Sequence, residues 1–260
     1  MYFWKSLYIK HYMSLPGTVN EEERNLNVYD FDGTIFYTDC TIGFAIWCTK
    51  RHPELCSTFW PGITRSFIQY KRKELPNYKL QRRFFSYLAM IDDFDVQIER
   101  YWDKYEKKIS KWYLEQKRPD DLIISASPDC IIGPIAKRLG VHYVATEYDR
   151  EYGVFLNNLM YAKEKAKYIF DHGFPVIENF YSDSLSDTPL ALCAEKAYIV
   201  KHKGTIVVDW PELVTEDVAV PMPKFDAEAE VSAWPDLDKE TMEIVKEEID
   251  SGWNVHLKED

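Results

Sequence analysis

Short apolar runs and stretches of helical periodicity alternate along two parts of the chain. The apolar runs predict buried strands at 27–29, 122–124, 141–146, 177–181, 197–200 and 205–208. Between them, helical spacing predicts helices at 129–139, 163–170 and 188–196. Gly153 is expected to form a turn between two short extended pieces. Strands that alternate with helices predict an α/β fold, built as a doubly wound parallel sheet with helices on both faces.

The segment 38–118 has a different pattern. It is rich in aromatic residues, Lys and Arg, and helical spacing predicts several helices with breaks near Pro53, Pro61 and Pro76. We therefore expect an all-helical domain, inserted between the two parts of a Rossmann-like core at 26–37 and 119–210. The core of the inserted domain is expected to contain Phe84, Phe85, Trp102, Tyr105 and Trp112.

Two extensions flank these domains, at 1–25 and 211–260. The chain of 260 residues has a net charge of −11, and 14 Asp/Glu against 4 Lys between 215 and 260 account for nearly all of it. This balance argues against nucleic-acid binding, which needs a basic surface. A short helix is predicted at 237–249 in the acidic C-terminal extension, which is interpreted as an arm over the body or as a partner-binding arm. The aromatic N-terminal extension is interpreted either as a packed or frayed segment or as a segment that binds a membrane surface or a partner.

The cysteines and the hydropathy pattern favour a cytoplasmic protein. The chain has five cysteines, an odd number, and no CxxC pair, so a disulfide framework or a zinc site is not expected. No apolar run reaches the roughly 18–20 residues that a membrane helix needs.

Polar residues follow three of the predicted strands. Asp30 and Asp32 come after the first strand, Ser125 ends the second and Asp183 follows the fourth. Because the carboxyl ends of parallel strands form the ligand-binding edge of such a sheet, these residues are expected to converge there. Two carboxylates as close as Asp30 and Asp32 repel each other unless a cation or a proton lies between them, and Mg²⁺ is the usual cation. Each residue taken singly also has an ordinary structural explanation.

Four motifs in order resemble the haloacid dehalogenase (HAD) superfamily, in its phosphoserine-phosphatase-like branch. They are Asp30-Phe31-Asp32-Gly33-Thr34, Ser125 after an apolar strand, Lys165, and Asp183-Ser184-Leu185-Ser186-Asp187. The resemblance covers about 27–208 and includes neither extension. It implies a helical cap at 38–118, which excludes water and selects the leaving group of a small phosphorylated metabolite.

The resemblance also implies a role for each motif residue. Asp30 would be the nucleophile that becomes phosphorylated, and Asp32 the general acid and base. Ser125, Lys165 and the backbone N–H of Ala126 would bind the phosphoryl group. Mg²⁺ would be held by the carboxylates of Asp30 and Asp183 and by the carbonyl of Asp32.

Three further residues complete this set of expectations. Asp187 would orient Lys165 or a metal-bound water. Lys163 competes with Lys165 as the phosphate-binding lysine, since Ala162-Lys163-Glu164-Lys165 departs from the Gly-Glu-Glu-Lys of the branch. In the inserted domain, Asp39 is a candidate to bind the substrate.

The function implied is a Mg²⁺-dependent phosphatase of small phosphomonoesters, working through an aspartyl-phosphate. One alternative is a phosphotransferase that passes the phosphoryl group to an alcohol. The other is a non-catalytic binding module of the same fold that acts through its acidic arm. The sequence does not distinguish among phosphoserine, phosphocholine, phosphoethanolamine and sugar phosphates, and it leaves the oligomeric state open.

Overall fold

The computed structural model describes residues 26–174, 176–202 and 204–211, which form two compact units. The sheet unit contains 26–37, 106–146 and the described residues from 158 to 211; the helical unit contains 38–105 and 147–157. The N-terminal extension 1–25, the predicted helix at 237–249 and the acidic segment from 212 onward lie outside the described residues.

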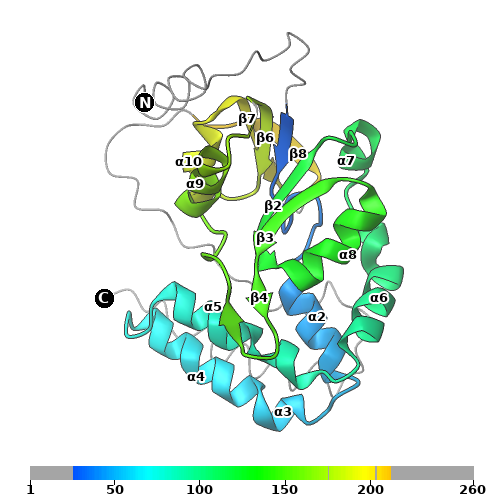
Figure 1. Ribbon diagram of the computed structural model, residues 1–260, viewed down its shortest axis with the longest axis vertical. Coiled ribbons are helices and arrows are strands. Elements are labelled where there is room, and N and C mark those ends of the chain that lie inside the picture. Colours follow the sequence, from blue (N-terminus) through cyan, green and yellow to red (C-terminus); the bar gives the residue numbers. More distant parts are fainter. Residues whose placement is uncertain (1–25, 175, 203, 212–260) are drawn as a thin grey trace. The chain divides into compact units, whose positions relative to one another are not determined.

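Six strands form the central sheet of the sheet unit, in the order β3-β2-β1-β6-β7-β8 (Figure 1). Their bounds are β1 (Leu26–Tyr29), β2 (Leu122–Pro128), β3 (His142–Thr146), β6 (Ile177–Ser182), β7 (Ala194–Lys201) and β8 (Ile206–Asp209). Every neighbouring pair is parallel except β7 and β8. In register, Val28 of β1 lies between Leu122 of β2 and Phe180 of β6. The structure confirms the predicted doubly wound, mostly parallel sheet.

Helices cover both faces of this sheet because its central strands are apolar on both sides. Side chains of one face, among them Val28 and Ile124, pack with Ile169 and Leu190 in one buried cluster. Those two residues belong to α9 (Lys163–Asp171) and α10 (Thr188–Ala191). The other face carries Tyr29, whose ring packs against Tyr113. It is covered by α7 (Lys111–Gln116) and α8 (Asp129–Leu139), and α8 ends at Gly140, which has a positive φ of 68°.

The prediction of a helix through 188–196 was wrong in its second half. The chain makes a short 3-10 turn, η3 (Leu185–Asp187), and one turn of α10, and then enters β7 at Ala194. Ala194 pairs with Ile177 of β6. Helix propensity at Ala194-Glu195-Lys196 is therefore overridden by strand pairing with a neighbour that is distant in sequence.

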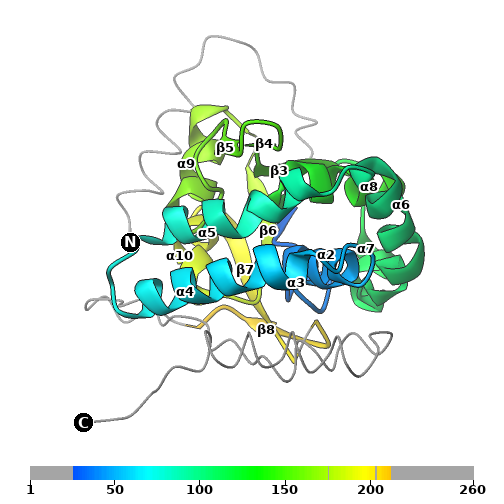
Figure 2. The ribbon, with the colours of Figure 1, turned by 90° about the horizontal axis from the view of Figure 1, so that it is seen from below.

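The helical unit contains most of the predicted helices of the inserted segment. They are α2 (Cys40–Thr49), α3 (Leu55–Thr58), α4 (Trp60–Lys71), α5 (Asn77–Phe85), η1 (Ser86–Met90) and α6 (Phe94–Tyr105). The breaks lie near Pro53, Pro61 and Pro76, as predicted, because proline is tolerated only in the first turn of a helix. Helices α4 and α5 lie side by side (Figures 1 and 2).

Aromatic side chains fill the core of the helical unit. All ten residues of α2 are buried, and the ring of Phe44 packs edge-on against Phe94 and Tyr101. The unit also contains a hairpin, β4 (Tyr148–Asp149) and β5 (Val154–Phe155), whose two aromatic rings pack against Phe85. The unit is therefore not purely helical, because chain from beyond the predicted insert completes its core.

The segment 106–118 was placed in the inserted domain by its sequence pattern, but it belongs to the sheet unit. Trp112 of this segment packs against Tyr29 and Tyr181, and its indole N–H donates a hydrogen bond to the carbonyl of Gly204 at 2.6 Å. Trp112 is therefore part of the sheet unit, whereas Phe84, Phe85, Trp102 and Tyr105 are buried in the helical unit.

Within the part of the chain that the structure describes, no helix has the length and apolar character needed to span a membrane. All five cysteines lie in this part, and each is a free thiol.

Candidate active site

The first motif follows β1 and forms a tight turn. The N–H of Asp30 still donates to the carbonyl of Tyr181 in β6, at 2.9 Å, so Asp30 lies at the carboxyl end of the sheet. The chain then folds back, and the carbonyl of Phe31 accepts hydrogen bonds from the N–H groups of residues 34, 35 and 36. Phe31 is fully buried and stacks on Phe36. Gly33 has a positive φ of 74°, which an L-residue rarely adopts.

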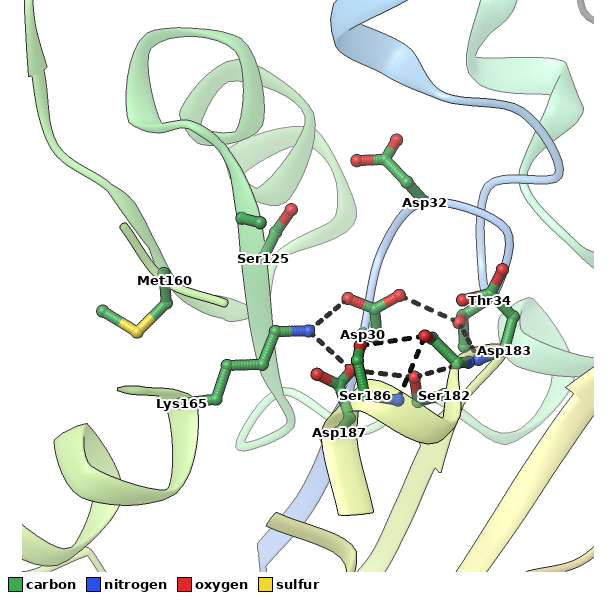
Figure 3. A network of polar contacts seen from close by, with 12 residues as sticks. Asp30, Asp32, Thr34, Ser125, Met160, Lys165, Ser182, Asp183, Ser186 and Asp187 are labelled. Atoms are coloured by element: carbon green, nitrogen blue, oxygen red, sulfur yellow. Dashed lines mark hydrogen bonds and ion pairs between the residues drawn. The ribbon is translucent and has the colours of Figure 1, made fainter. Parts of the chain in front are cut away.

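The carboxylate of Asp30 is held from both sides (Figure 3). Lys165 Nζ donates to Oδ1 at 2.6 Å, and Thr34 Oγ1 donates to Oδ2 at 3.1 Å. The same Thr34 oxygen accepts from the backbone N–H of Asp183 at 2.9 Å. Thr34 therefore joins the first motif to the fourth, a role that the sequence analysis did not assign to it. Thr34 is fully buried, and its place four residues after Asp30 in the motif is the only sequence signal for this role.

Lys165 rather than Lys163 reaches the site. Lys165 lies in the first turn of α9 and is 2% exposed, whereas Lys163 is exposed. Its ammonium also donates to Asp187 Oδ2 at 2.8 Å, and Ser182 Oγ donates to the same oxygen at 2.8 Å. Burial alone lowers the pKa of Lys165, but the charges of Asp187 and Asp30 outweigh it and raise the pKa above its ordinary value. The structure thus places Asp187 where it orients Lys165. Ser182, which the sequence analysis did not single out, supports Asp187 through its hydrogen bond.

Negative charge is in excess at this edge of the sheet. Burial raises the pKa of Asp30, and the charge of Asp187 adds to this although Lys165 opposes it. The pKa of Asp183 is raised well above its usual value, because the groups packed around its carboxylate reduce its hydration and because Asp30 and Asp187 repel it, although the residue as a whole is exposed. Lys165 contacts the carboxylates of Asp30 and Asp187, and Asp183 adds a third carboxylate that these two repel.

The donors present fit a hard divalent cation. Among the described residues, no three Asp, Glu, His or Cys side chains are grouped as a ready metal site. Mg²⁺ in phosphoryl-transfer sites, however, takes one or two carboxylates and completes its shell with water and substrate oxygens. Asp30 and Asp183 supply two such carboxylates, and a cation bound between them would relieve their mutual repulsion.

Asp32 lies apart from this network. Figure 3 shows its carboxylate on the turn above Asp30, away from the Asp30–Lys165 pair. Ser127 Oγ donates a hydrogen bond to Asp32 Oδ2 at 2.6 Å. The two acidic residues of the first motif therefore have different surroundings, since Asp30 is buried against a cation and Asp32 is partly exposed beside a hydroxyl. The sequence analysis missed Ser127, although period-two alternation places Ser125 and Ser127 on the same side of a strand.

The second motif lies in the last part of β2, where the pairing with β3 shifts register. Ser125 is 1% exposed, and its Oγ accepts from the N–H of Ser127 at 3.1 Å. The carbonyl of Ala126 accepts from Thr146 Oγ1 at 2.8 Å. Figure 3 shows Ser125 on the same side of the site as Lys165. Ser125 thus lies at the expected edge of the sheet, next to the Asp30–Lys165 pair.

Asp39 belongs to the helical unit and caps a helix there. Its Oδ1 accepts a hydrogen bond from the N–H of Ile42 at 2.8 Å, at the start of α2. An N-terminal cap of this kind satisfies a helix N–H and accounts for an acidic residue at this position. The substrate-binding role of Asp39 stays a prediction.

Comparison with known proteins identifies the family. The family model of the haloacid dehalogenase-like hydrolases matches residues 28–192, more than half of the chain. The chain therefore belongs to the haloacid dehalogenase-like hydrolase family. A search of curated proteins found no match.

Several solved structures are similar to this chain at low sequence identity. A protein of unknown function from Bordetella pertussis Tohama I is 18% identical, with a TM-score of 0.53, and the match covers 67% of this chain and 88% of that one. A phosphoserine phosphohydrolase-like protein from Francisella tularensis is 18% identical, with a TM-score of 0.44 and coverage of 68% and 87%. A phospho-aspartyl intermediate analogue of phosphoserine phosphatase is 14% identical, with a TM-score of 0.42 and coverage of 68% and 86%.

Proposed function

We propose that this hydrolase is a Mg²⁺-dependent phosphatase that cleaves a small phosphomonoester through an aspartyl-phosphate at Asp30. The observation that carries the proposal is the position of the Asp30 carboxylate, between Lys165 Nζ at 2.6 Å and Thr34 Oγ1 at 3.1 Å, with a second acid two residues away. The family places the chain among hydrolases, and the four motifs resemble those of the phosphoserine-phosphatase-like branch.

In the first step, an oxygen of Asp30 attacks phosphorus and the bond from phosphorus to the ester oxygen breaks. The electron pair of that bond stays on the ester oxygen, which takes a proton from Asp32 and leaves as an alcohol. The ammonium of Lys165 and the hydroxyl of Ser125 stabilise the negative charge on the phosphoryl oxygens. Lys165 is suited to this because Asp187 and Ser182 hold it in place.

In the second step, Asp32 takes a proton from water, and the water oxygen attacks the phosphorus of the aspartyl-phosphate. Phosphate leaves, and the Asp30 carboxylate is restored. A separate carboxyl for proton transfer suits this sequence of steps, because an alkoxide is a poor leaving group without a proton. The different surroundings of Asp30 and Asp32 support this division of roles.

Mg²⁺, when bound, neutralises charge between the carboxylates and the phosphoryl oxygens. Asp30 and Asp183 are the residues that would hold it through their carboxylates, with the backbone carbonyl of Asp32. Asp183 is tied to Asp30 through Thr34, so the two ligands are positioned together.

The helical unit, which contains 38–105 of the inserted segment together with 147–157, is proposed to supply a cap that chooses the leaving group. The insertion of 38–105 between the first and second motifs supports this, as does the unit's own aromatic core. The substrate class proposed is therefore a small phosphorylated metabolite, and the proposed compartment is the cytoplasm.

The test is phosphate release from a panel of small phosphomonoesters, with Mg²⁺ and with EDTA. Asp30→Asn is compared with Asp171→Asn, which changes an exposed aspartate at the end of α9. We expect Mg²⁺-dependent turnover that Asp30→Asn abolishes and Asp171→Asn leaves unchanged, with a phosphorylated protein seen by mass spectrometry after acid quenching. If turnover requires an added alcohol, the protein is a phosphotransferase and not a hydrolase of the ester. Inactivity of the wild-type protein on every ester, with and without alcohols, would contradict the proposal.

A further inference from the structure

The short hydrogen bond between Ser127 and Asp32 joins the second motif to the first. At 2.6 Å from oxygen to oxygen, it lies at the short end of the range for hydrogen bonds donated by a hydroxyl. Ser127 is 7% exposed, so water competes little for its hydroxyl. The partners are 95 residues apart in sequence, and the contact therefore depends on the neighbouring positions of β1 and β2 in the sheet.

The donor is held by the backbone around it. The N–H of Ser127 donates to Ser125 Oγ, and Thr146 Oγ1 of the adjacent strand donates to the carbonyl of Ala126. The register between β2 and β3 shifts between Ser125 and Pro128, and Ser127 lies within this irregular stretch. Ser127 thus lies in an irregular part of β2 that hydrogen bonds fix on two sides.

Asp32, the acceptor of this hydrogen bond, needs a donor whose position is fixed. Asp32 lies on the turn after β1 and is partly exposed, so two side-chain torsions determine where its carboxyl points. Transfer of a proton to the ester oxygen requires the carboxyl to lie within hydrogen-bond reach of that oxygen. A donor on Oδ2 limits these torsions and so fixes the orientation of the carboxyl group.

We infer that Ser127 is a positioning residue for Asp32, holding its carboxyl in the orientation that protonates the departing ester oxygen. The inference rests on the function proposed above and adds a residue to it. In the step concerned, the bond from Asp30 to phosphorus forms and the phosphorus–ester bond breaks. The electron pair of the broken bond remains on the ester oxygen, and the proton of Asp32 joins it.

The test uses two substrates that differ in their need for that proton. An alkyl phosphate releases a strongly basic alkoxide, whereas 2,4-dinitrophenyl phosphate releases a weakly basic phenolate that leaves without a proton. We expect Ser127→Ala to lower kcat/KM for the alkyl phosphate by about tenfold to a hundredfold, the range for a misplaced catalytic group. The loss for the aryl phosphate should be under about threefold, because the acid contributes little there. Ser127→Thr keeps the hydroxyl and should restore most of the alkyl-phosphate activity.

Two controls separate positioning from a general loss of structure. In an Asp32→Asn background, Ser127→Ala should cause no further loss, because residues that act through one another are not additive. Ser66→Ala removes a buried hydroxyl in the helical unit that donates to the carbonyl of Gly62, and should leave the ratio of the two activities unchanged.

Equal losses on both esters, or an additional loss in the Asp32→Asn background, would overturn the role of Ser127 while leaving the phosphatase itself standing. A wild-type protein that is inactive on both esters and on the wider panel would remove the proposed function, and this inference with it.

Discussion

Lys165 and Asp30 form an ion pair of 2.6 Å across 135 residues of sequence, and both groups are almost fully buried. The same ammonium contacts Asp187, so one cation serves two buried carboxylates. Removal of one partner from a buried ion pair leaves an uncompensated charge and is far more costly than removal of a surface pair. This relationship makes Lys165 the residue on which both the stability and the charge balance of the site depend.

Lys165→Met should therefore lower the free energy of unfolding by about 3–5 kcal/mol, because two carboxylates lose their cation inside the protein. Phosphatase activity should fall by at least about a hundredfold. Lys163→Met is the matched control, since it makes the same change at an exposed position of the same helix turn and should alter stability by less than about 0.5 kcal/mol. Urea unfolding and phosphate release measure the two effects. Similar losses for the two variants would mean that the buried pair is unimportant.

The clustered carboxylates also predict how stability depends on pH. The folded-state pKa of Asp183 lies well above its ordinary value, through reduced hydration of its carboxylate and repulsion by Asp30 and Asp187, although the residue as a whole is exposed. Between the ordinary aspartate value of about 3.9 and the raised pKa, the folded state holds a proton that the unfolded state has lost. Stability in EDTA should therefore decrease as the pH rises through this range.

Asp183→Asn should remove this contribution, giving a flatter stability profile and a protein at least as stable as the wild type at neutral pH without metal. Mg²⁺ should raise the melting temperature of the wild type and have little effect on Asp183→Asn, because binding to the folded state alone stabilises it. Urea titrations at several pH values and thermal melts with and without Mg²⁺ measure this. If Asp183→Asn keeps the pH dependence of stability and the full Mg²⁺-induced rise in melting temperature, Asp183 is the source of neither effect.

Gly33 lies in the turn of the first motif, directly beside the carboxylate of Asp183. Its φ of 74° disfavours an L-residue, and a Cβ added there would overlap the carboxylate of Asp183. We expect Gly33→Ala to cost about 1–2 kcal/mol of stability from the left-handed backbone and, in addition, to displace Asp183 and abolish Mg²⁺-dependent turnover. Gly140→Ala is the control, because Gly140 has a φ of 68° and no atom within 4 Å of the added Cβ. It should cost similar stability and leave activity intact; loss of activity in both variants would point to backbone strain instead.

Ala162 carries backbone strain at the start of α9. Its φ of 52° and ψ of −120° are unfavourable for any residue with a Cβ, and its carbonyl accepts the N–H of Lys165 in the first helix turn. Ala162→Gly should raise the free energy of unfolding by about 1 kcal/mol, because relief of the strain exceeds the entropy cost of glycine. Ala166→Gly, within the same helix, should instead lower it by about 1 kcal/mol or more. Urea unfolding of both variants measures these changes in the free energy of unfolding. A loss of stability in Ala162→Gly would show that the backbone of Ala162 is not strained.

The sequence by itself determined the sheet and the edge of it at which the motif residues lie. Apolar runs such as 122–124 are buried on both faces, and this pattern, alternating with helices, is specific enough to predict parallel strands. Because parallel strands end at one edge, Asp30, Ser125 and Asp183 could be placed together from their positions after strands. The same local pattern misjudged 194–196, where pairing with β6 outweighs helix propensity.

Tertiary structure alone decided which neighbours these residues have. The sequence left Lys163 and Lys165 as alternatives, and only the packing of α9 buries one of them against Asp30. Likewise, an amphipathic pattern shows that a residue is buried but does not show which residues it packs against. Trp112 was therefore assigned to the helical domain, whereas it packs in the sheet unit. The hydrogen bond from Ser127 to Asp32 depends on a turn and a register shift between strands. Contacts of this kind arise from the three-dimensional path of the chain, which hydrophobic periodicity does not encode.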